Sequence, residues 1–162
     1  MHIIGASIAV TFDLIYPFSQ GKNVANYIHA NQLEDKIIVG WRDDFMPSII
    51  AYGNLKQIYY PQGKRFGSFV IFDSKRQKPI TLEEIVEPVI TLGKKPEDFL
   101  FIFTPEIFNF DFILPDVHHI SQIERSSFDI NSSTYRFKKL IVFAPSIVLG
   151  ENFALYKLEK EK

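Results

Sequence analysis

The chain has 162 residues and a mass of 18.8 kDa, which suits one domain with a substantial core and is too short for two ordinary domains. A formal charge of −1 and the lack of any long basic run exclude nucleic acid as a partner, because phosphate binding needs clustered Lys and Arg. The absence of cysteine excludes disulfides, Cys-ligated zinc and thiol catalysis, and it leaves the cellular compartment open.

Short apolar runs, rich in β-branched and aromatic residues, predict buried strands along the chain. They lie at 3–10, 36–40, 56–60, 68–73, 98–103 and 138–143. The first run has two interpretations: a buried strand, or the stub of a membrane segment, since about 20 apolar residues are needed to span a bilayer. The sixteen Phe residues likewise suit either an aromatic core or exposed contact sites.

Apolar residues at helical spacing predict three helices, over residues 19–31, 43–52 and 81–92. Ser19 is placed to accept a hydrogen bond from a free N–H of the first helical turn. Thr81 and Glu84 have the spacing of a capping box, and Gly93 is expected to end the third helix. Pro88 lies inside that helix and predicts a kink or a break near Glu87.

The pattern becomes weaker after residue 104. Residues 104–119 resemble a loop with at most a short strand, residues 123–143 predict two antiparallel strands joined through 129–133, and residues 153–158 predict an edge strand. Alternating strands and helices predict the α/β class, with a three-layer Rossmann-like sheet that is mostly parallel and has antiparallel strands at its C-terminal end. We expect residues 1–162 to form one domain.

The sequence Ser-Gln-Gly-Lys at residues 19–22 does not fit a phosphate-binding P-loop. Tyr16 stands where the first glycine of that motif belongs, and Asn23 stands where its Ser or Thr belongs. Two interpretations remain: plain capping by Ser19, or an anion site at a helix N-terminus with Lys22 adding charge. No G-x-G-x-x-G motif occurs, so no nucleotide cofactor is expected.

Motifs for catalysis or metal binding are also missing. His118 and His119 are adjacent and would point to opposite faces of a strand, so we expect no metal site there. No G-x-S-x-G motif marks a nucleophilic serine. The sequence therefore assigns no catalytic residue.

Charged residues just after predicted strands are the best ligand-binding candidates, because open α/β sheets bind ligands at the carboxyl ends of their strands. Aromatic side chains nearby suit sugar rings. Ordinary loop charges and helix caps are the alternative interpretation of the charged residues. Together with Ser19 and Lys22, the candidates are Trp41, Asp43, Asp44, Asp73, Lys75, Arg76 and Glu106, and Tyr59 and Tyr60 are further candidates for sugar contact.

Three runs carry a resemblance: DLIYPFSQGKNVANYI, IIVGWRDD and AYGNLKQIYYPQGKRFGSFVIFDSKRQ. They resemble the C-terminal extramembrane portion of bacterial multi-spanning membrane proteins similar to lipid-linked-sugar glycosyltransferases. The resemblance covers roughly residues 8–76, with a weaker match in ENFALYKL. It implies a fragment of a larger membrane protein, at the extracytoplasmic face of the bacterial inner membrane. The acidic catalytic residues of such enzymes lie in their membrane half, so none is carried over to this chain.

Two functions are therefore expected. The first is a non-catalytic extracytoplasmic accessory domain, whose partner is the membrane-embedded portion of the same polypeptide and which contacts a glycan or a lipid-linked sugar. The alternative is a free-standing soluble α/β protein, cytoplasmic, that binds a small molecule or an anion at the carboxyl edge of its sheet. The Phe-rich tract at 99–114 suits a lid over the sheet, or contact with lipid or with the membrane half.

Overall fold

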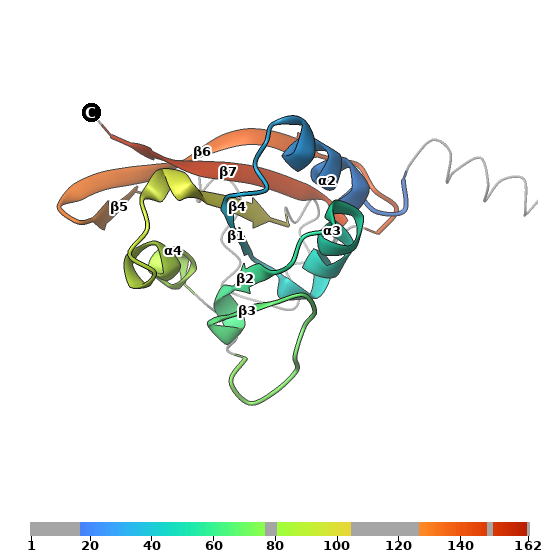
Figure 1. Ribbon diagram of the computed structural model, residues 1–162, viewed down its shortest axis with the longest axis horizontal. Coiled ribbons are helices and arrows are strands. Elements are labelled where there is room, and N and C mark those ends of the chain that lie inside the picture. The colour runs from blue at the N-terminus through green and yellow to red at the C-terminus, as the bar shows by residue number, and fades with distance from the viewer. Residues whose placement is uncertain (1–16, 77–80, 105–126, 149–150, 162) are drawn as a thin grey trace, which may run out of the picture.

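The structure is a computed structural model that describes residues 17–76, 81–104, 127–148 and 151–161. Within these ranges the chain forms a seven-stranded mixed sheet in the order β3-β2-β1-β4-β7-β6-β5 (Figure 1). Strand β1 pairs in parallel with β2 and β4, and the other described pairings are antiparallel. The strands are β1 (Ile37–Gly40), β2 (Ile58–Tyr60), β3 (Arg65–Gly67), β4 (Phe99–Phe103), β5 (Ser127–Ile130), β6 (Ser133–Phe143) and β7 (Phe153–Lys160).

The α/β class is confirmed, but the described part of the sheet is less parallel than predicted. Parallel pairing is confined to the three strands β2, β1 and β4. The strands predicted at 36–40, 56–60, 98–103 and 138–143 are present, as is the antiparallel pair β5–β6. The run at 3–10 and the segment 105–119, with His118 and His119, lie outside the described residues.

Two strand predictions are wrong. Residues 68–73 form no strand, because β3 pairs antiparallel with β2 at Arg65–Gly67 and the chain then leaves the sheet. The segment from Phe153 is not an edge strand, because β7 lies between β4 and β6. Its side chains from Phe153 to Tyr156 are fully buried, as expected for an interior strand with neighbours on both sides.

The three predicted helices are present as α2 (Gly21–Ala30), α3 (Met46–Gly53) and α4 (Leu82–Thr91), and a 3₁₀ turn at Asp43–Phe45 precedes α3. Thr81 and Glu84 form the predicted capping box, and Gly93 follows α4 with φ of 61°. Pro88 does not split α4, since the helix runs unbroken to Thr91. None of the described helices combines the length and the apolar character needed to cross a membrane.

Alternate residues of the central strands face two separate cores. Val39, Phe99, Phe101 and Phe103 pack in one core with the apolar face of α4. Ile38, Leu100 and Ile102 pack in the other core with α2 and α3. Figure 1 shows α4 on one side of the sheet and α2 with α3 on the opposite side. Side chains on both faces of the central strands are therefore packed in apolar cores. Polar side chains gather where those strands end.

Candidate functional site

The carboxyl ends of the parallel strands β1, β2 and β4 lie at one edge of the sheet. Three buried polar side chains follow them: Asp43 after β1, Gln62 after β2 and Thr104 after β4. The backbone N–H of Asp43 donates a hydrogen bond to Oε1 of Gln62 over 3.3 Å, which joins the ends of β1 and β2. This is the edge at which the sequence predicted a ligand crevice.

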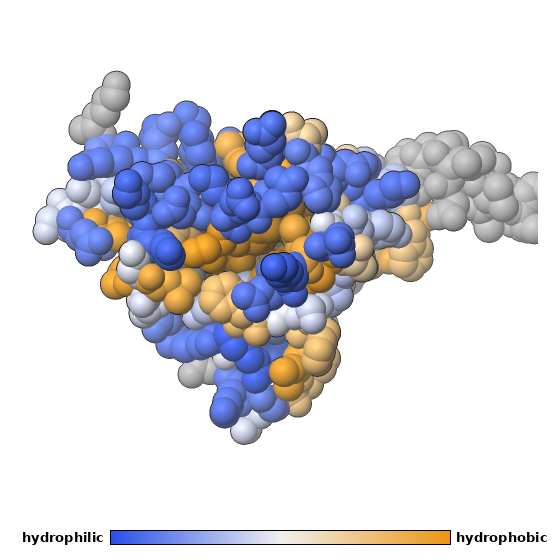
Figure 2. All heavy atoms as spheres, in the orientation of Figure 1, coloured by the Kyte–Doolittle hydropathy of each residue, from blue (hydrophilic) through white to orange (hydrophobic). Residues whose placement is uncertain are grey.

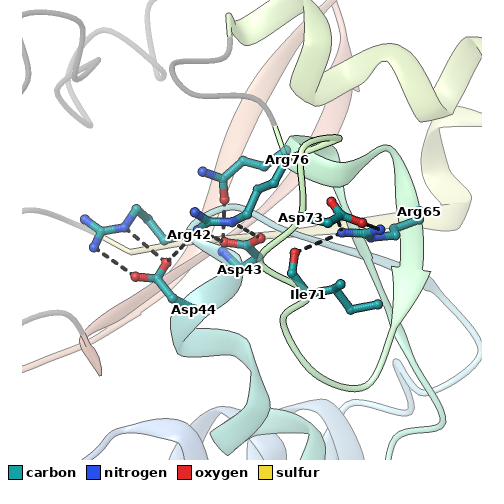
Figure 3. Close-up of polar contacts among 8 residues, drawn as sticks. Arg42, Asp43, Asp44, Arg65, Ile71, Asp73 and Arg76 are labelled. Atoms are coloured by element: carbon teal, nitrogen blue, oxygen red, sulfur yellow. Dashed lines mark hydrogen bonds and ion pairs between the residues drawn. The ribbon is translucent and has the colours of Figure 1, made fainter.

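The strongest interaction at this edge is a two-point ion pair between Asp43 and Arg76 (Figure 3). The guanidinium Nε of Arg76 lies 2.8 Å from Oδ2 of Asp43, and the second guanidinium nitrogen bonds to Oδ1. The two side chains are only 7% and 4% exposed. The hydrogen bonds that Arg76 donates to Asp43 raise the pKa of Arg76, and the charges of Asp43 and Asp44 add to this effect. Burial of the guanidinium acts in the opposite direction. The Arg76 guanidinium therefore stays charged.

Asp44 extends this ion pair to a second arginine. Arg42 donates to both carboxylate oxygens of Asp44, over 3.4 and 3.2 Å, and Arg76 lies 3.9 Å from Asp44 on the other side. Arg42 has a left-handed backbone with φ of 65°, at the point where β1 gives way to the 3₁₀ turn. Its guanidinium carbon also lies 4.8 Å from the centre of the Phe45 ring. The two aspartates are thus held by two arginines.

A second ion pair fixes the segment that leads to Arg76. Arg65, on β3, donates to both oxygens of Asp73 over 2.7 and 3.1 Å and to the carbonyl of Ile71 over 3.0 Å (Figure 3). Asp73 also accepts from the backbone N–H of Lys75. The hydrogen bonds from Arg65, followed by its charge, lower the pKa of Asp73. The segment between Arg65 and Arg76 is therefore tied down at both ends.

The residues between these ties form an exposed loop, here called the apolar loop (residues 67–76). Phe69, Ile71 and Phe72 are 63%, 43% and 76% exposed. Figure 1 shows this loop projecting from the rest of the molecule, and Figure 2 shows hydrophobic residues at that projection beside hydrophilic ones. Exposed aromatic side chains gathered in one place typically mark a contact surface.

Two buried hydroxyl groups near the strand ends have no hydrogen-bond partner among the residues that the structure describes. They are Oγ1 of Thr104, which follows β4, and the phenol of Tyr60, the last residue of β2. Burial, and to a smaller extent the charge of Asp43, raises the pKa of Tyr60. A buried hydroxyl without a partner costs free energy, so each is a point where a ligand group or a water would be favoured.

The structure therefore brings together four of the predicted residues, Asp43, Asp44, Asp73 and Arg76, with Lys75 in the same loop. Ser19 and Lys22 lie elsewhere, at the start of α2, where Ser19 accepts the predicted hydrogen bond from a first-turn N–H, that of Gly21, over 2.9 Å. The N-cap residue itself is Gln20, whose side chain does not cap the helix. Glu106 lies outside the described residues.

The aromatic candidates are mostly enclosed by the fold. Trp41 is half-buried, and its ring packs at 6.3 Å from that of Phe103. Tyr59 and Tyr60 are 7% and 2% exposed, so their rings offer little surface to a sugar. Their assignment as sugar contacts is wrong for that reason: they belong to the two cores.

Sequence reasoning missed Arg42, Gln62, Arg65 and Thr104. The run Trp-Arg-Asp-Asp at 41–44 already places Arg42 beside both aspartates. Arg65 lies eight residues before Asp73, and a tight loop can bring side chains at this separation into contact. The sequence did not predict that loop, because residues 68–73 were wrongly predicted to form a strand. Gln62 and Thr104 carry no local signal, since only the parallel order of β1, β2 and β4 brings the residues after these strands to the same edge of the sheet.

In the described ranges, no group of three or more His, Cys, Asp or Glu is placed to hold a metal ion. The carboxylates at the strand ends are instead bound by arginine side chains. The fold is that of an α/β protein with a mixed sheet. Comparison of the chain with protein-family models, with curated proteins and with solved structures finds no match.

Proposed function

We propose that this chain is a non-catalytic extracytoplasmic accessory domain of a polytopic bacterial membrane protein of the glycosyltransferase-like kind. Its partner is the membrane-embedded portion of the same polypeptide. The observation that carries the proposal is the ion pair between Asp43 and Arg76, which engages the carboxylate after β1 in holding the end of the apolar loop. The carboxyl edge of the sheet thus supports a contact surface.

The geometry of the acidic groups supports a structural role for them. A general acid or base needs a carboxyl group that can reach a substrate proton. Asp43 is 3% exposed and Asp44 and Asp73 are bound to arginines over 3.2 and 2.7 Å, so all three are engaged within the protein. Held in this way, they fix the position of a loop.

The exposed aromatic residues support a contact role at a membrane protein. Phe69 and Phe72 offer the ring faces that Tyr59 and Tyr60 do not, so we assign contact with a glycan or a lipid carrier to the apolar loop. Phe18 and Ile147 are also exposed, and the backbone N–H of Ile147 bonds to the carbonyl of Pro17, the residue before Phe18.

The finer architecture belongs to the same proposal. We infer a three-layer Rossmann-like arrangement, with α2 and α3 as one outer layer, the sheet in the middle and α4 as the other outer layer. The two separate cores on alternate residues of β1 and β4 support it.

Fractionation of the natural host tests the proposal. An antibody raised against the 162-residue chain should detect a species larger than 18.8 kDa that stays in membranes after a carbonate wash. In spheroplasts with intact membranes, added protease should remove the epitope. A soluble 18.8 kDa species would overturn the proposal, and a protected epitope would overturn the extracytoplasmic location.

The buried hydroxyl of Thr104 favours the second candidate, a free-standing protein that binds a small molecule or an anion at the carboxyl edge. That hydroxyl is 3% exposed and has no partner within the described part of the chain. Titration of the ¹⁵N-labelled chain with inorganic phosphate and with simple sugars tests this candidate. Saturable amide shifts at Asp43, Gln62 and Thr104 would support it, and unchanged spectra would exclude these ligands.

A further inference from the structure

We infer that the apolar loop (residues 67–76) inserts Phe69 and Phe72 into the interfacial region of a bilayer that contains anionic phospholipid. The inference rests on the proposed function, which places the domain at a membrane. It goes further by naming the surface that is contacted and the side chains that make the contact.

Hydrophobic exposure in the described part of the chain is concentrated at this loop. Of the ten large hydrophobic residues that are exposed, three lie on the loop, at Phe69, Ile71 and Phe72, and a fourth, Phe66, lies just before it on β3. Phe72, at 76%, is the most exposed of all ten. Scattered exposed apolar residues are ordinary on a protein surface, whereas a cluster on one projecting loop indicates a contact site.

The loop is held in an outward conformation before any contact is made. Arg65 binds Asp73 and the carbonyl of Ile71, and Arg76 binds the buried Asp43 (Figure 3). The Arg76 guanidinium also lies 4.9 Å from the centre of the Phe72 ring. A loop that is already ordered loses little conformational entropy on binding. More of the favourable free energy of burying its rings is therefore kept as binding free energy.

Charge around the loop favours an anionic lipid surface. The segment from Lys64 to Arg76 contains four basic residues, and three of them are ion-paired: Lys64 with Glu87, Arg65 with Asp73 and Arg76 with Asp43. The fourth, Lys75, is exposed on the loop and forms no ion pair within the described residues, so its amine is the charge that can meet a headgroup phosphate. Apolar tips between long basic side chains suit the lipid interface, where rings enter the acyl boundary and the amines stay among the headgroup phosphates.

Vesicle binding by the 162-residue chain tests the inference. We expect the chain to co-sediment with vesicles of phosphatidylcholine and phosphatidylglycerol, and to bind phosphatidylcholine alone at least fivefold more weakly. The double variant Phe69→Ser and Phe72→Ser should bind the mixed vesicles at least tenfold more weakly. A control variant, Tyr52→Ser, removes an aromatic residue that is 58% exposed on α3 and should bind like the native chain. Circular dichroism checks that both variants fold.

The depth of insertion gives a second readout. Trp41 is the only tryptophan of the native chain and packs against Phe103, so brominated lipid should leave its fluorescence unchanged. In the variant Phe72→Trp, the same lipid should quench the added fluorescence. Equal quenching of the native chain would contradict insertion by this loop.

Three results would overturn the inference: no binding to the mixed vesicles, equal binding by the Phe69→Ser, Phe72→Ser variant, or a concentration-dependent dimer of the native chain that this variant abolishes. The last result would assign the loop to a second copy of the chain. These outcomes are separate from a failure of the proposed function, because fractionation of the host reports on the polypeptide and the vesicles report on the loop.

Discussion

Arg76 and Asp43 are 33 positions apart in the sequence, yet the guanidinium of one binds both carboxylate oxygens of the other at the carboxyl edge of the sheet. The pair joins the end of β1 to the end of the apolar loop. Two-point arginine–carboxylate contacts fix orientation as well as distance. The position of the apolar loop therefore depends on a residue that is itself buried.

Replacing Asp43 with Asn should destabilise the chain, because it leaves the Arg76 guanidinium buried without its counter-charge. Breaking a buried ion pair by removing one partner costs about 3–5 kcal/mol, and we expect the lower end because the loop can move Arg76 into solvent. The matched control is Arg65→Gln, which breaks a pair at side chains 26% and 36% exposed and should cost far less, because solvent screens an exposed pair. Urea unfolding measures both. Similar losses for the two variants would contradict the dominance of the Asp43 pair.

Asp73 gives a pH dependence whose sign follows from its lowered pKa. Hydrogen bonds from Arg65, then its charge, hold that pKa below the ordinary value of 3.8. The ionised carboxylate therefore stabilises the fold above this value, and the contribution is lost as the pH falls through the lower, folded-state pKa. The difference in unfolding free energy between the native chain and Asp73→Asn should be largest near neutral pH and vanish in acid. A difference that grew in acid would contradict this assignment.

The Tyr60 phenol should contribute nothing favourable to stability, because it is buried and has no hydrogen-bond partner in the described ranges of the chain. Tyr60→Phe keeps the ring in the core and removes the unpaired hydroxyl, so it should be neutral or stabilising by up to about 1 kcal/mol. Thermal and urea unfolding measure the change. A loss greater than about 1 kcal/mol would indicate a bound water or other partner at the phenol oxygen.

The local parts of the fold were predictable because their signals are local. Thr81 and Glu84 lie three residues apart and form the predicted capping box, and the apolar spacing of α4 placed it within one residue at each end. The acidic residues after β1 were predicted from their position after a buried strand. Each of these signals lies within a few residues of the structure that it specifies.

The wrong predictions involve non-local pairing. The run at 68–73 has the composition of a strand, but β3 pairs with the outer edge of β2 instead. The local sequence does not indicate which of the two segments pairs with β2. Phe153 begins a strand that looks terminal in sequence, yet β7 lies inside the sheet because β6 and β4 pair with its two sides. Strand order is decided by contacts between distant segments, so composition alone could not give it.

Thr104→Val separates the two candidate functions. The substitution keeps the shape of a side chain that is 3% exposed and removes a hydroxyl that has no partner in the described part of the chain, so the ligand-free chain should keep its stability or gain up to about 1 kcal/mol. If the carboxyl edge binds phosphate, the variant should lose affinity roughly tenfold, as expected when one hydrogen bond to a charged group is removed. If the chain is an accessory domain that contacts a membrane through its loop, vesicle binding should be unchanged. Urea unfolding, phosphate titration and co-sedimentation of the same variant measure the three quantities, and a variant that lost both stability and vesicle binding would contradict both assignments.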